Sequence, residues 1–582
     1  MKYITKHFKG HYKELILGPL FKLLEAVMEL FVPLVMATIM DIGIANQDTP
    51  YILSRGVLLF VIAALSVVAA MLCQYFAAKV AGAFGRNMRN DMFRHIMRFS
   101  GNEIGEVGTS ALIVRLTNDI SQVQTSVNMV IRLGSRAPFL AIGSIIMAMT
   151  IDIKIGMIFL LSTPIIILVL YIIMKKTLPQ YRHIQGEQDK LSRLSAENLE
   201  GARVIRAFSK QKQEQQEYER VTDYLSDIIV RTGRISAALS PITTIIVNIA
   251  IAVIVWMGAN AVNDGVLGSG KVVALVSYMN QTLLALIVAA QLIILFTRGI
   301  ASAKRIVSVM GIEPSIQKKN INDEVQDNIA VRFDDVTFSY HKSAGASLEN
   351  ISFSIMPGEM AGLIGGTGSG KTTIINLIMR YFDTQKGNVI VNGKNIKGEN
   401  PEEFRKDIAL VPQKAVLFSG TIRHNLLMSM PKATEEQLWD ALETAQAKSF
   451  VDELPKKLDS VVEEGGHNFS GGQRQRLTIA RAVLRKPSLL ILDDSASALD
   501  LATDAALRIA LKEEMDKNPG MTVFIIGQRV STIKTADQII VLDDGKISGI
   551  GKHEELIQYN ADYREICQSQ GIDCEVGNEV QV

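Results

Sequence analysis

The sequence predicts an all-α membrane domain, with six spanning helices and long cytoplasmic helical extensions, fused to an α/β domain built around a phosphate-binding loop. Three observations predict this fold class. Apolar stretches long enough to cross a bilayer are confined to the first 300 residues. Long polar segments with a helical pattern separate some of them. The second half alternates short strand-like and helical segments around a glycine-rich loop, as α/β domains do.

Composition is consistent with this division. A chain of 582 residues is too long for one hydrophobic core and indicates two or more domains. Hydrophobic residues make up 48% of the chain, which is high for a wholly soluble protein. The net charge of +2 gives no indication of a nucleic-acid partner. Three cysteines, Cys73, Cys567 and Cys574, have neither a disulfide framework nor metal-ligand spacing, which suits a protein facing the cytosol.

Six apolar stretches have the length of about 20 residues that a membrane-spanning helix needs. They cover residues 15–40, 56–80, 129–150, 155–174, 237–262 and 272–296. The first and third are inferred partly from spacing, because charged residues lie in or beside them. Residues 1–14 precede them as a short basic amphipathic segment, which we expect to lie along the cytoplasmic membrane surface.

The connections between the spans set the predicted topology. Residues 41–55, 151–154 and 263–271 are short, whereas residues 81–128 and 175–236 are long, polar and rich in arginine and lysine. By the positive-inside rule, the long segments and both termini face the cytoplasm. The helical pattern continues to about residue 310, residues 311–328 read as a linker, and the α/β domain occupies 329–582.

The phosphate-binding loop follows an apolar run, 360–364, and precedes a helical pattern at 373–379. Its glycines allow backbone N–H groups to face phosphates, and the helix N-terminus adds partial positive charge. Lys371 is expected to reach the β- and γ-phosphates, and the Thr372 hydroxyl to bind Mg²⁺. The loop consists of Gly365, Gly366, Thr367, Gly368, Ser369, Gly370, Lys371 and Thr372.

Two further patterns lie downstream. Four apolar residues, 489–492, read as a buried strand that ends in Asp493. A buried carboxylate without a partner is costly, so a magnesium role is preferred for Asp493. The second pattern is Ser470, Gly471, Gly472 and Gln473, followed by Arg474, for which the sequence offers no simple packing reason.

Together the glycine loop and the Ser-Gly-Gly-Gln motif resemble the nucleotide-binding domain of ATP-binding cassette (ABC) transporters, and the six-span layout resembles exporters of the half-transporter type (type IV). The resemblance implies ATP and Mg²⁺ as cofactors and coupling helices near 110–119 and 200–208. For the ATP site, it implies that Tyr340 stacks on adenine, that Thr373 belongs to the site and that Gln413 contacts Mg²⁺. It also implies that Glu464 links the nucleotide domain to a coupling helix. Asp500 would end a loop that crosses to the partner domain.

Two positions depart from the family pattern. After Asp493 the family normally has the glutamate that polarises the attacking water, whereas this chain has Asp494. Where the family has a histidine that contacts the γ-phosphate, this chain has Gln528, whose amide cannot become cationic. A carboxylate one methylene shorter misplaces the catalytic oxygen, which can cost on the order of a hundredfold in rate. Both changes predict that the site built on Lys371 binds ATP and hydrolyses it slowly.

In this family two domains sandwich ATP, so the resemblance implies a dimer in a lipid bilayer. The intact 470–473 motif would serve the partner's site, and the favoured interpretation is a heterodimer whose second half-transporter carries the catalytic glutamate and histidine. A homodimer with two slow sites remains an alternative, as does a regulatory ABC protein that uses ATP as a switch. The six spans exclude a soluble ABC ATPase, and importers usually carry the two domains on separate chains.

The substrate is not encoded in a motif. The resemblance favours export of amphipathic small molecules of the multidrug type across a bacterial plasma membrane, with lipid or peptide export by a homodimer as the alternative. Glu25 and Glu29 share one face of the first span. They are expected either to bind cationic substrates or to pair with Lys22, Arg132 or Arg136.

Overall fold

The computed structural model describes residues 2–316, 328–340, 345–495 and 498–571. It divides into two compact units, one of residues 1–96 and 109–312, the other of residues 97–108 and 313–582. We call them the membrane unit and the nucleotide unit. Most of the predicted linker, residue 497 of the loop that ends at Asp500, and Cys574 lie outside the described residues.

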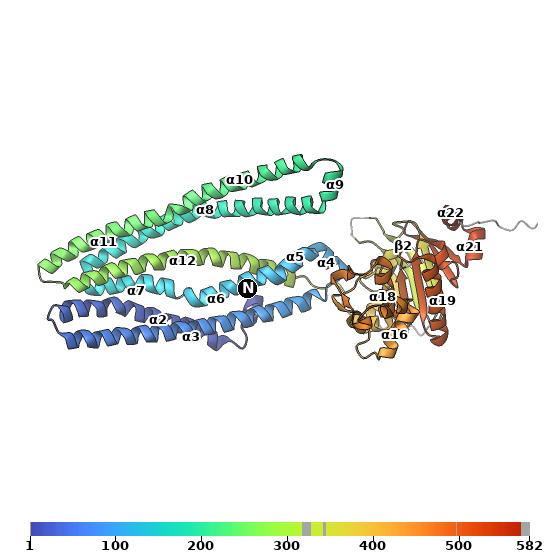
Figure 1. Cartoon of the computed structure of the whole chain (residues 1–582), viewed down its shortest axis with the longest axis horizontal. Helices are drawn as coiled ribbons and strands as arrows, with labels where there is room; N and C mark the ends of the chain where they lie inside the picture. The colour runs from blue at the N-terminus through green and yellow to red at the C-terminus, as the bar shows by residue number, and fades with distance from the viewer. Residues whose placement is uncertain (1, 317–327, 341–344, 496–497, 572–582) are drawn as a thin grey trace, which may run out of the picture. The chain divides into compact units, whose positions relative to one another are not determined.

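The membrane unit is helical throughout. Its elements are α1 (Lys2–Lys6), α2 (Tyr12–Thr38), the π-helical η1 (Ile39–Ile44), α3 (Thr49–Ile96), α5 (Thr109–Val114), the π-helical η2 (Arg115–Asp119), α6 (Ile120–Leu133), α7 (Arg136–Ile151), α8 (Ile153–Glu200), α9 (Ala202–Ala207), α10 (Gln211–Ala237), α11 (Leu239–Asn263) and α12 (Ser269–Met310). In Figure 1, α2 runs beside α3, and α8 runs beside α10 with α9 joining their ends.

Six segments of the described chain are long and apolar enough to cross a membrane, and each contains one of the stretches predicted from sequence. The fold class is therefore confirmed. The helices are much longer than the membrane requires: α3 and α8 each have 48 residues, of which about 20 suffice for a bilayer. The remaining turns form the long helical extensions. The apolar core of this unit gathers residues of α2, α7, α8, α11 and α12.

The predicted coupling segments are helical. Residues 110–119 lie in α5 and η2, and residues 200–208 include α9. The adjoining helix α4 (Gly101–Val107) groups with the nucleotide unit. There Gly101 lies so close to Phe382 that a Cβ would come within 2.6 Å of the ring. Contact of 110–119 and 200–208 with the nucleotide unit stays a prediction.

The nucleotide unit contains twelve strands among its described residues. They are β1 (Val331–Phe338), β2 (Leu348–Ile355), β3 (Met360–Gly365), β4 (Lys386–Val391), β5 (Lys394–Asn395), β6 (Ile408–Val411), β7 (Gly420–Thr421), β8 (Val461–Val462), β9 (Leu489–Asp493), β10 (Thr522–Gly527), β11 (Gln538–Asp543) and β12 (Lys546–Gly551).

In addition to α4, its helices are α13 (Lys371–Ile378), η3 (Ile396–Gly398), α14 (Pro401–Phe404), η4 (Arg405–Asp407), α15 (Ile422–Leu427), α16 (Glu435–Thr444), α17 (Lys448–Asp452), η5 (Lys457–Asp459), η6 (Glu464–Gly466), α18 (Gly471–Val483), α19 (Leu501–Lys517), α20 (Val530–Ile533), α21 (His553–Tyr559) and α22 (Ala561–Ser569). The predicted strands at 360–364 and 489–493 and the helix at 373–379 correspond to β3, β9 and α13.

The central sheet has the strand order β12-β11-β3-β10-β9-β6. Strands β11, β3, β10, β9 and β6 are parallel, and β12 is antiparallel to β11. One face packs with α13 against an antiparallel sheet of order β2-β1-β4-β5. The other face packs against helices that include α18 and α19 (Figure 1). Because parallel strands end at the same edge, the segments after β3, β10, β9 and β6 meet there.

Candidate functional site

The phosphate-binding loop leaves β3, whose six residues are all buried, and ends at the first turn of α13. Gly368 and Gly370 have φ angles of 86° and 103°, which favour glycine. A Cβ at Gly370 would also lie 2.7 Å from a methyl group of Leu348. Gly366, Thr367 and Gly368 are exposed, so the loop presents its backbone to solvent at the N-terminus of α13.

Lys371 lies across this loop. Its ammonium group donates to the carbonyls of Gly365 at 2.9 Å and of Gly366 at 2.6 Å. Burial lowers the pKa of Lys371, and the carboxylates of Asp494 and Asp493 oppose this shift. The ammonium group is therefore held on the loop by weak carbonyl acceptors, which the phosphate oxygens of a nucleotide can replace.

Asp493 is the last residue of β9 and Asp494 follows it; β9 pairs with β10, which separates it from β3. Burial raises the pKa of Asp493 to about 6, the neighbouring Asp494 adds to the shift and Lys371 opposes it. Asp494 has a φ of 44°, and its backbone N–H donates to Ile526 of β10 at 2.7 Å. The Gln413 side-chain nitrogen lies 3.4 Å from Asp494 Oδ2.

This donor set fits a magnesium ion that is shared with phosphates. Among the described residues no group of three or more His, Cys, Asp or Glu side chains could hold a metal ion unaided. Mg²⁺ typically takes one or two protein ligands and completes its shell with waters and substrate phosphates. Thr372 is exposed at the start of α13, and burial together with Asp494 raises the pKa of Asp493, which a bound cation would oppose. Thr372, Asp493 and Gln413 remain the predicted ligands.

Tyr340 lies just after β1, beside the phosphate loop. Its hydroxyl donates to Thr373 Oγ1 at 3.2 Å and accepts from Asn376 at 3.1 Å, which ties it to α13. Its ring packs edge-on against Phe338 and Phe382. The tyrosine is thus fixed next to the loop, as an adenine platform would be, and its stacking role stays a prediction.

The Ser470–Gln473 segment begins α18, a different helix from the one that follows the phosphate loop. Ser470 and Gln473 form a capping box: the Ser470 hydroxyl accepts from the Gln473 backbone N–H at 3.3 Å, and the Gln473 side-chain oxygen Oε1 accepts from the Ser470 backbone N–H at 2.9 Å. The capping box gives this motif a local structural role, for which the sequence had offered no simple packing reason. Ser470 is exposed, so its hydroxyl and the first turn of α18 face solvent.

Asp500 is the N-cap of α19. Its carboxylate accepts from the backbone N–H of Thr503 at 2.9 Å and from the Thr503 hydroxyl at 2.8 Å, and these bonds lower its pKa. The Asp500 cap fixes where α19 begins, so it also positions the chain just before Asp500.

Glu464 lies in the short helix η6.

Gln528 is exposed directly after β10. Gln570, at the end of α22, donates from its side chain to the Gln528 carbonyl at 2.7 Å and accepts from the Val530 N–H at 2.9 Å. Sequence reasoning missed Gln570, because the two residues are 42 positions apart and no pattern links them. Gln570 thereby holds the backbone on both sides of Arg529, directly after Gln528.

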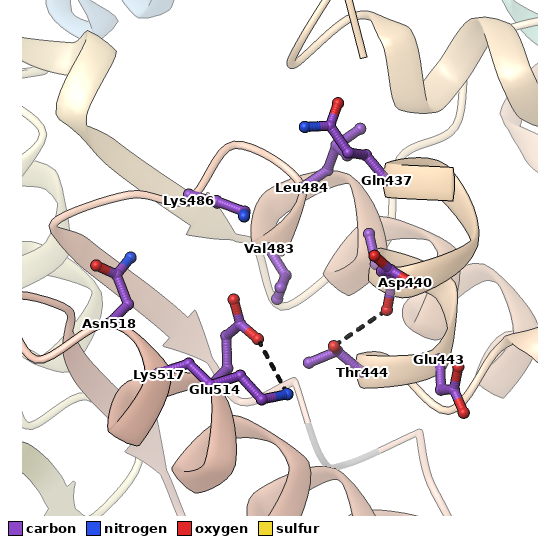
Figure 2. A pocket seen from close by; sticks show the side chains of 11 residues that line it. Gln437, Asp440, Glu443, Thr444, Val483, Leu484, Lys486, Glu514, Lys517 and Asn518 are labelled. Carbon is purple, nitrogen blue, oxygen red and sulfur yellow. Dashed lines mark hydrogen bonds and ion pairs between the residues drawn. The ribbon is translucent and has the colours of Figure 1, made fainter. Parts of the chain in front are cut away.

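A cavity of about 460 Å³ lies elsewhere in the nucleotide unit, between α16 and the C-terminal ends of α18 and α19 (Figure 2). Glu514 and Lys517 form an ion pair of 4.0 Å on its wall, and the Thr444 hydroxyl donates to the Asp440 carbonyl. None of the predicted ATP-site residues lines it. It is distinct from the nucleotide site.

In the membrane unit the two glutamates of α2 are both paired. Lys22 donates to Glu25 at 2.6 and 2.8 Å, and Arg136 of α7 donates to Glu29 at 2.7 Å. Of the two expectations for Glu25 and Glu29, internal pairing is the one observed.

Comparisons with known proteins show which families and structures this chain resembles. Residues 15–286 match the family model of the ABC transporter transmembrane region, and residues 348–497 match that of the ABC transporter. The chain is 33% identical to an uncharacterized ABC transporter ATP-binding protein of Mycobacterium tuberculosis, covering 99% of each chain. It is 31% identical to an ATP-dependent lipid A-core flippase of Desulfotalea psychrophila, covering 84% of this chain and 85% of the flippase. Its fold is similar to that of a bacterial Atm1-family ABC exporter solved with ATP bound, at a TM-score of 0.80 and 21% identity, covering 96% of this chain and 99% of that one.

Proposed function

The chain belongs to the ABC transporter family, and we propose that it is one half of a heterodimeric exporter of amphipathic small molecules, with a slow ATP site of its own. The family membership makes it an ATP-hydrolysing export protein that works as a dimer in a lipid bilayer. The proposal adds the asymmetry between the two ATP sites, the multidrug-type substrate and a bacterial plasma membrane with both termini in the cytoplasm.

The pair of substitutions at Asp494 and Gln528 is the single observation that carries the proposal. Both positions follow adjacent strands of one sheet, β9 and β10, so both bear on the same bound nucleotide. Asp494 takes the position of the water-polarising base with a shorter side chain, and Gln528 offers an amide in place of an imidazole. Two weakened groups in one site favour ATP retention over turnover.

The remaining residues of the proposed site bind and orient ATP. The backbone of Gly366–Gly370 and the Lys371 ammonium group would hold the phosphates, Tyr340 the adenine ring, and Thr372, Gln413 and Asp493 the magnesium ion. Mg²⁺ supplies charge neutralisation on the phosphates when bound. Ser470–Gln473 and Asp500 would act across the dimer interface, in the partner's site. Ligand-driven closure then requires only that ATP bind the closed dimer better than the open one.

A homodimeric lipid exporter is the second candidate. It is favoured by the relative named as a lipid A-core flippase and by an intact 470–473 segment, which two copies of this chain could exchange. In that case both sites would contain Asp494 and Gln528, and both would have to hydrolyse ATP.

The ATPase rate of the full-length chain in lipid, alone and then co-purified with a candidate half-transporter from the same operon, separates the two. The heterodimer predicts a low rate alone, a sharp rise on pairing and a collapse when the partner's catalytic glutamate is changed to glutamine. Robust hydrolysis by this chain alone would replace the heterodimer with the homodimer.

A further inference from the structure

A small cavity inside the membrane unit has a charged end and apolar walls. It measures about 250 Å³ and lies between α2, α7 and α12. Glu29, Arg136 and Gln281 form its polar end, and Leu140, Leu284 and Val288 contribute to its apolar walls. All three helices lie in candidate membrane spans, so an ionisable group here needs either a partner or a function.

The cavity has a fixed frame. The buried hydroxyl of Tyr278 on α12 donates to the carbonyl of Leu30 on α2 at 2.6 Å, one residue from Glu29 and one turn from Gln281. On the other side α7 packs closely on α2, since a Cβ at Gly143 would come within 2.5 Å of a Leu30 methyl group. The polar end is therefore built on rigid helices, as a specific site requires.

Its polar groups are only partly satisfied. Arg136 uses Nη2 on Glu29, but its Nε is buried and has no hydrogen-bond partner among the described residues. The same is true of Gln281 Oε1 and of Ser135 Oγ, at the N-terminus of α7. Buried polar atoms are rarely left unpaired, because each costs about 1–3 kcal/mol. Arg136 Nε and the Ser135 hydroxyl are thus unused donors, whereas Gln281 Oε1 is an unused acceptor.

The groups that line the cavity leave a donor for an anion. Glu29 and Arg136 are its charged lining residues and balance each other, while Arg136 Nε has no partner among the described residues. The positive end of the α7 dipole, where Arg136 lies, also favours an anion.

A cationic ligand would have to displace a cation already in place, since Lys22 and Arg136 lie 2.6 and 2.7 Å from the two glutamates. An anionic group only has to accept from the unused Nε donor of Arg136. The volume corresponds to about eight water molecules, room for a phosphate or carboxylate and the first carbons of a chain. The Glu29 and Arg136 side chains are 33% and 29% exposed, so the cavity opens to the surface, where the chain can continue.

We propose that this cavity, framed by Glu29, Arg136 and Gln281, binds the anionic head group of an amphipathic substrate, with its apolar tail along Leu140, Leu284 and Val288. The proposal names the substrate class of the proposed exporter, and the ligand is a substrate only if the proposed export function holds. The binding site itself does not depend on the asymmetry of the ATP sites.

The test is nucleotide-free binding to the full-length chain, measured by native mass spectrometry from phosphatidylcholine nanodiscs. The probes are dodecyl phosphate and dodecyltrimethylammonium, which share a tail and differ in head charge, and inorganic phosphate. We expect dodecyl phosphate to bind at least tenfold more tightly than dodecyltrimethylammonium, and inorganic phosphate not to compete at equal concentration. Equal competition by inorganic phosphate would overturn the amphiphile in favour of a simple anion site.

The variants separate a binding role from a structural one. Arg136→Gln should weaken dodecyl phosphate binding about tenfold, whereas Glu29→Gln, which releases Arg136, should strengthen it. Loss of fold would move both variants in the same direction, and that outcome would overturn the proposal. Lys154→Gln removes an equal charge from an exposed position at the start of α8 and should change nothing. Weaker dodecyltrimethylammonium binding in Glu29→Gln and stronger binding in Arg136→Gln would assign the site to cations instead.

Stimulation of ATP hydrolysis is a second measurement, which separates failure of the binding site from failure of the export function. With a catalytically competent dimer, dodecyl phosphate should stimulate ATP hydrolysis, and Arg136→Gln should abolish the stimulation. Binding without any stimulation or transport would count against the export of such molecules and leave the site standing. Active export with no binding at this cavity would overturn the site alone.

Discussion

Gln570 holds Gln528 by its backbone: the Gln570 amide nitrogen donates to the Gln528 carbonyl at 2.7 Å, and the Gln570 amide oxygen accepts from Val530 N–H at 2.9 Å. Gln528, one of the two positions that depart from the family pattern, is therefore followed by a residue, Arg529, whose backbone is held on both sides by Gln570. Gln528 itself stays exposed at the edge where the parallel strands end.

Replacing Gln570 by alanine should loosen this loop. Each lost hydrogen bond is worth about 0.5–1.5 kcal/mol, so ATP affinity at this chain's site should fall about three- to tenfold if Gln528 contacts the γ-phosphate. Calorimetric titration with a non-hydrolysable ATP analogue measures it. ADP affinity should hardly change, and Gln568→Ala, two residues earlier on the same helix, serves as the control. An equal loss for ADP would mean general destabilisation.

Restoring the family residues should restore turnover. The double variant Asp494→Glu, Gln528→His should raise ATP hydrolysis by the chain alone roughly ten- to a hundredfold, because it moves a carboxylate toward the attacking water and supplies an imidazole. Phosphate release from the purified chain is the measurement. Adding Lys371→Ala to the double variant should remove the gain. No gain at all would mean that these two positions are not what limits the rate.

The Ser470 hydroxyl combines a local cap with its proposed role in the partner's site. Ser470→Ala should abolish the hydrolysis of a paired complex while leaving ATP binding to this chain's own site intact. Loss of the cap alone costs about 1 kcal/mol. Thr434 and Gln437 form a second capping box, at the start of α16, so Thr434→Ala is a matched control for the cap. An equal loss of hydrolysis in Thr434→Ala would reduce the role of Ser470 to capping.

Asp493 should make the nucleotide-free protein less stable as pH rises. Its pKa in the folded protein is raised to about 6 from 3.8, so the folded state binds more protons than the unfolded state between these values. Stability falls as pH rises through that window, and the penalty is complete above pH 6. Its size is on the order of 1 kcal/mol, after allowance for solvent screening of a partly exposed group. Thermal unfolding at pH 5 and 7.5 should show a smaller difference for Asp493→Asn. An unchanged difference would refute this origin.

The Lys22–Glu25 pair should be costly to break and cheap to replace. Both side chains are nearly buried, at 10% and 13% exposure, within a membrane span. Lys22→Met leaves a carboxylate unpaired and should destabilise the membrane unit by about 3–5 kcal/mol, whereas Lys22→Met with Glu25→Met should be close to neutral. Thermal unfolding in detergent measures this. Breaking the exposed Lys457–Asp452 pair should cost at most about 1 kcal/mol. Additive effects of the two methionine substitutions would contradict the pairing.

The sequence by itself determined the fold class and the main parts of the nucleotide site. Six spans follow from runs of apolar side chains, and β3, the phosphate loop and α13 follow from an apolar run, glycines and a helical pattern within 20 residues. These features are local: bilayer thickness and backbone geometry act on neighbouring residues, so their signals stand side by side in the chain.

Only the tertiary structure decided which distant groups meet. From the sequence, three cationic side chains were possible partners for Glu25 and Glu29. The packing of α7 against α2 brings Arg136 to Glu29, although the two residues are 107 positions apart. Gln570 and Gln528, 42 positions apart, are likewise brought together only by packing. The sequence does not specify which of several distant charged or amide side chains will pair with one another. Pairing is selected by the distances that packing imposes, because electrostatic and hydrogen-bond energies fall steeply with separation.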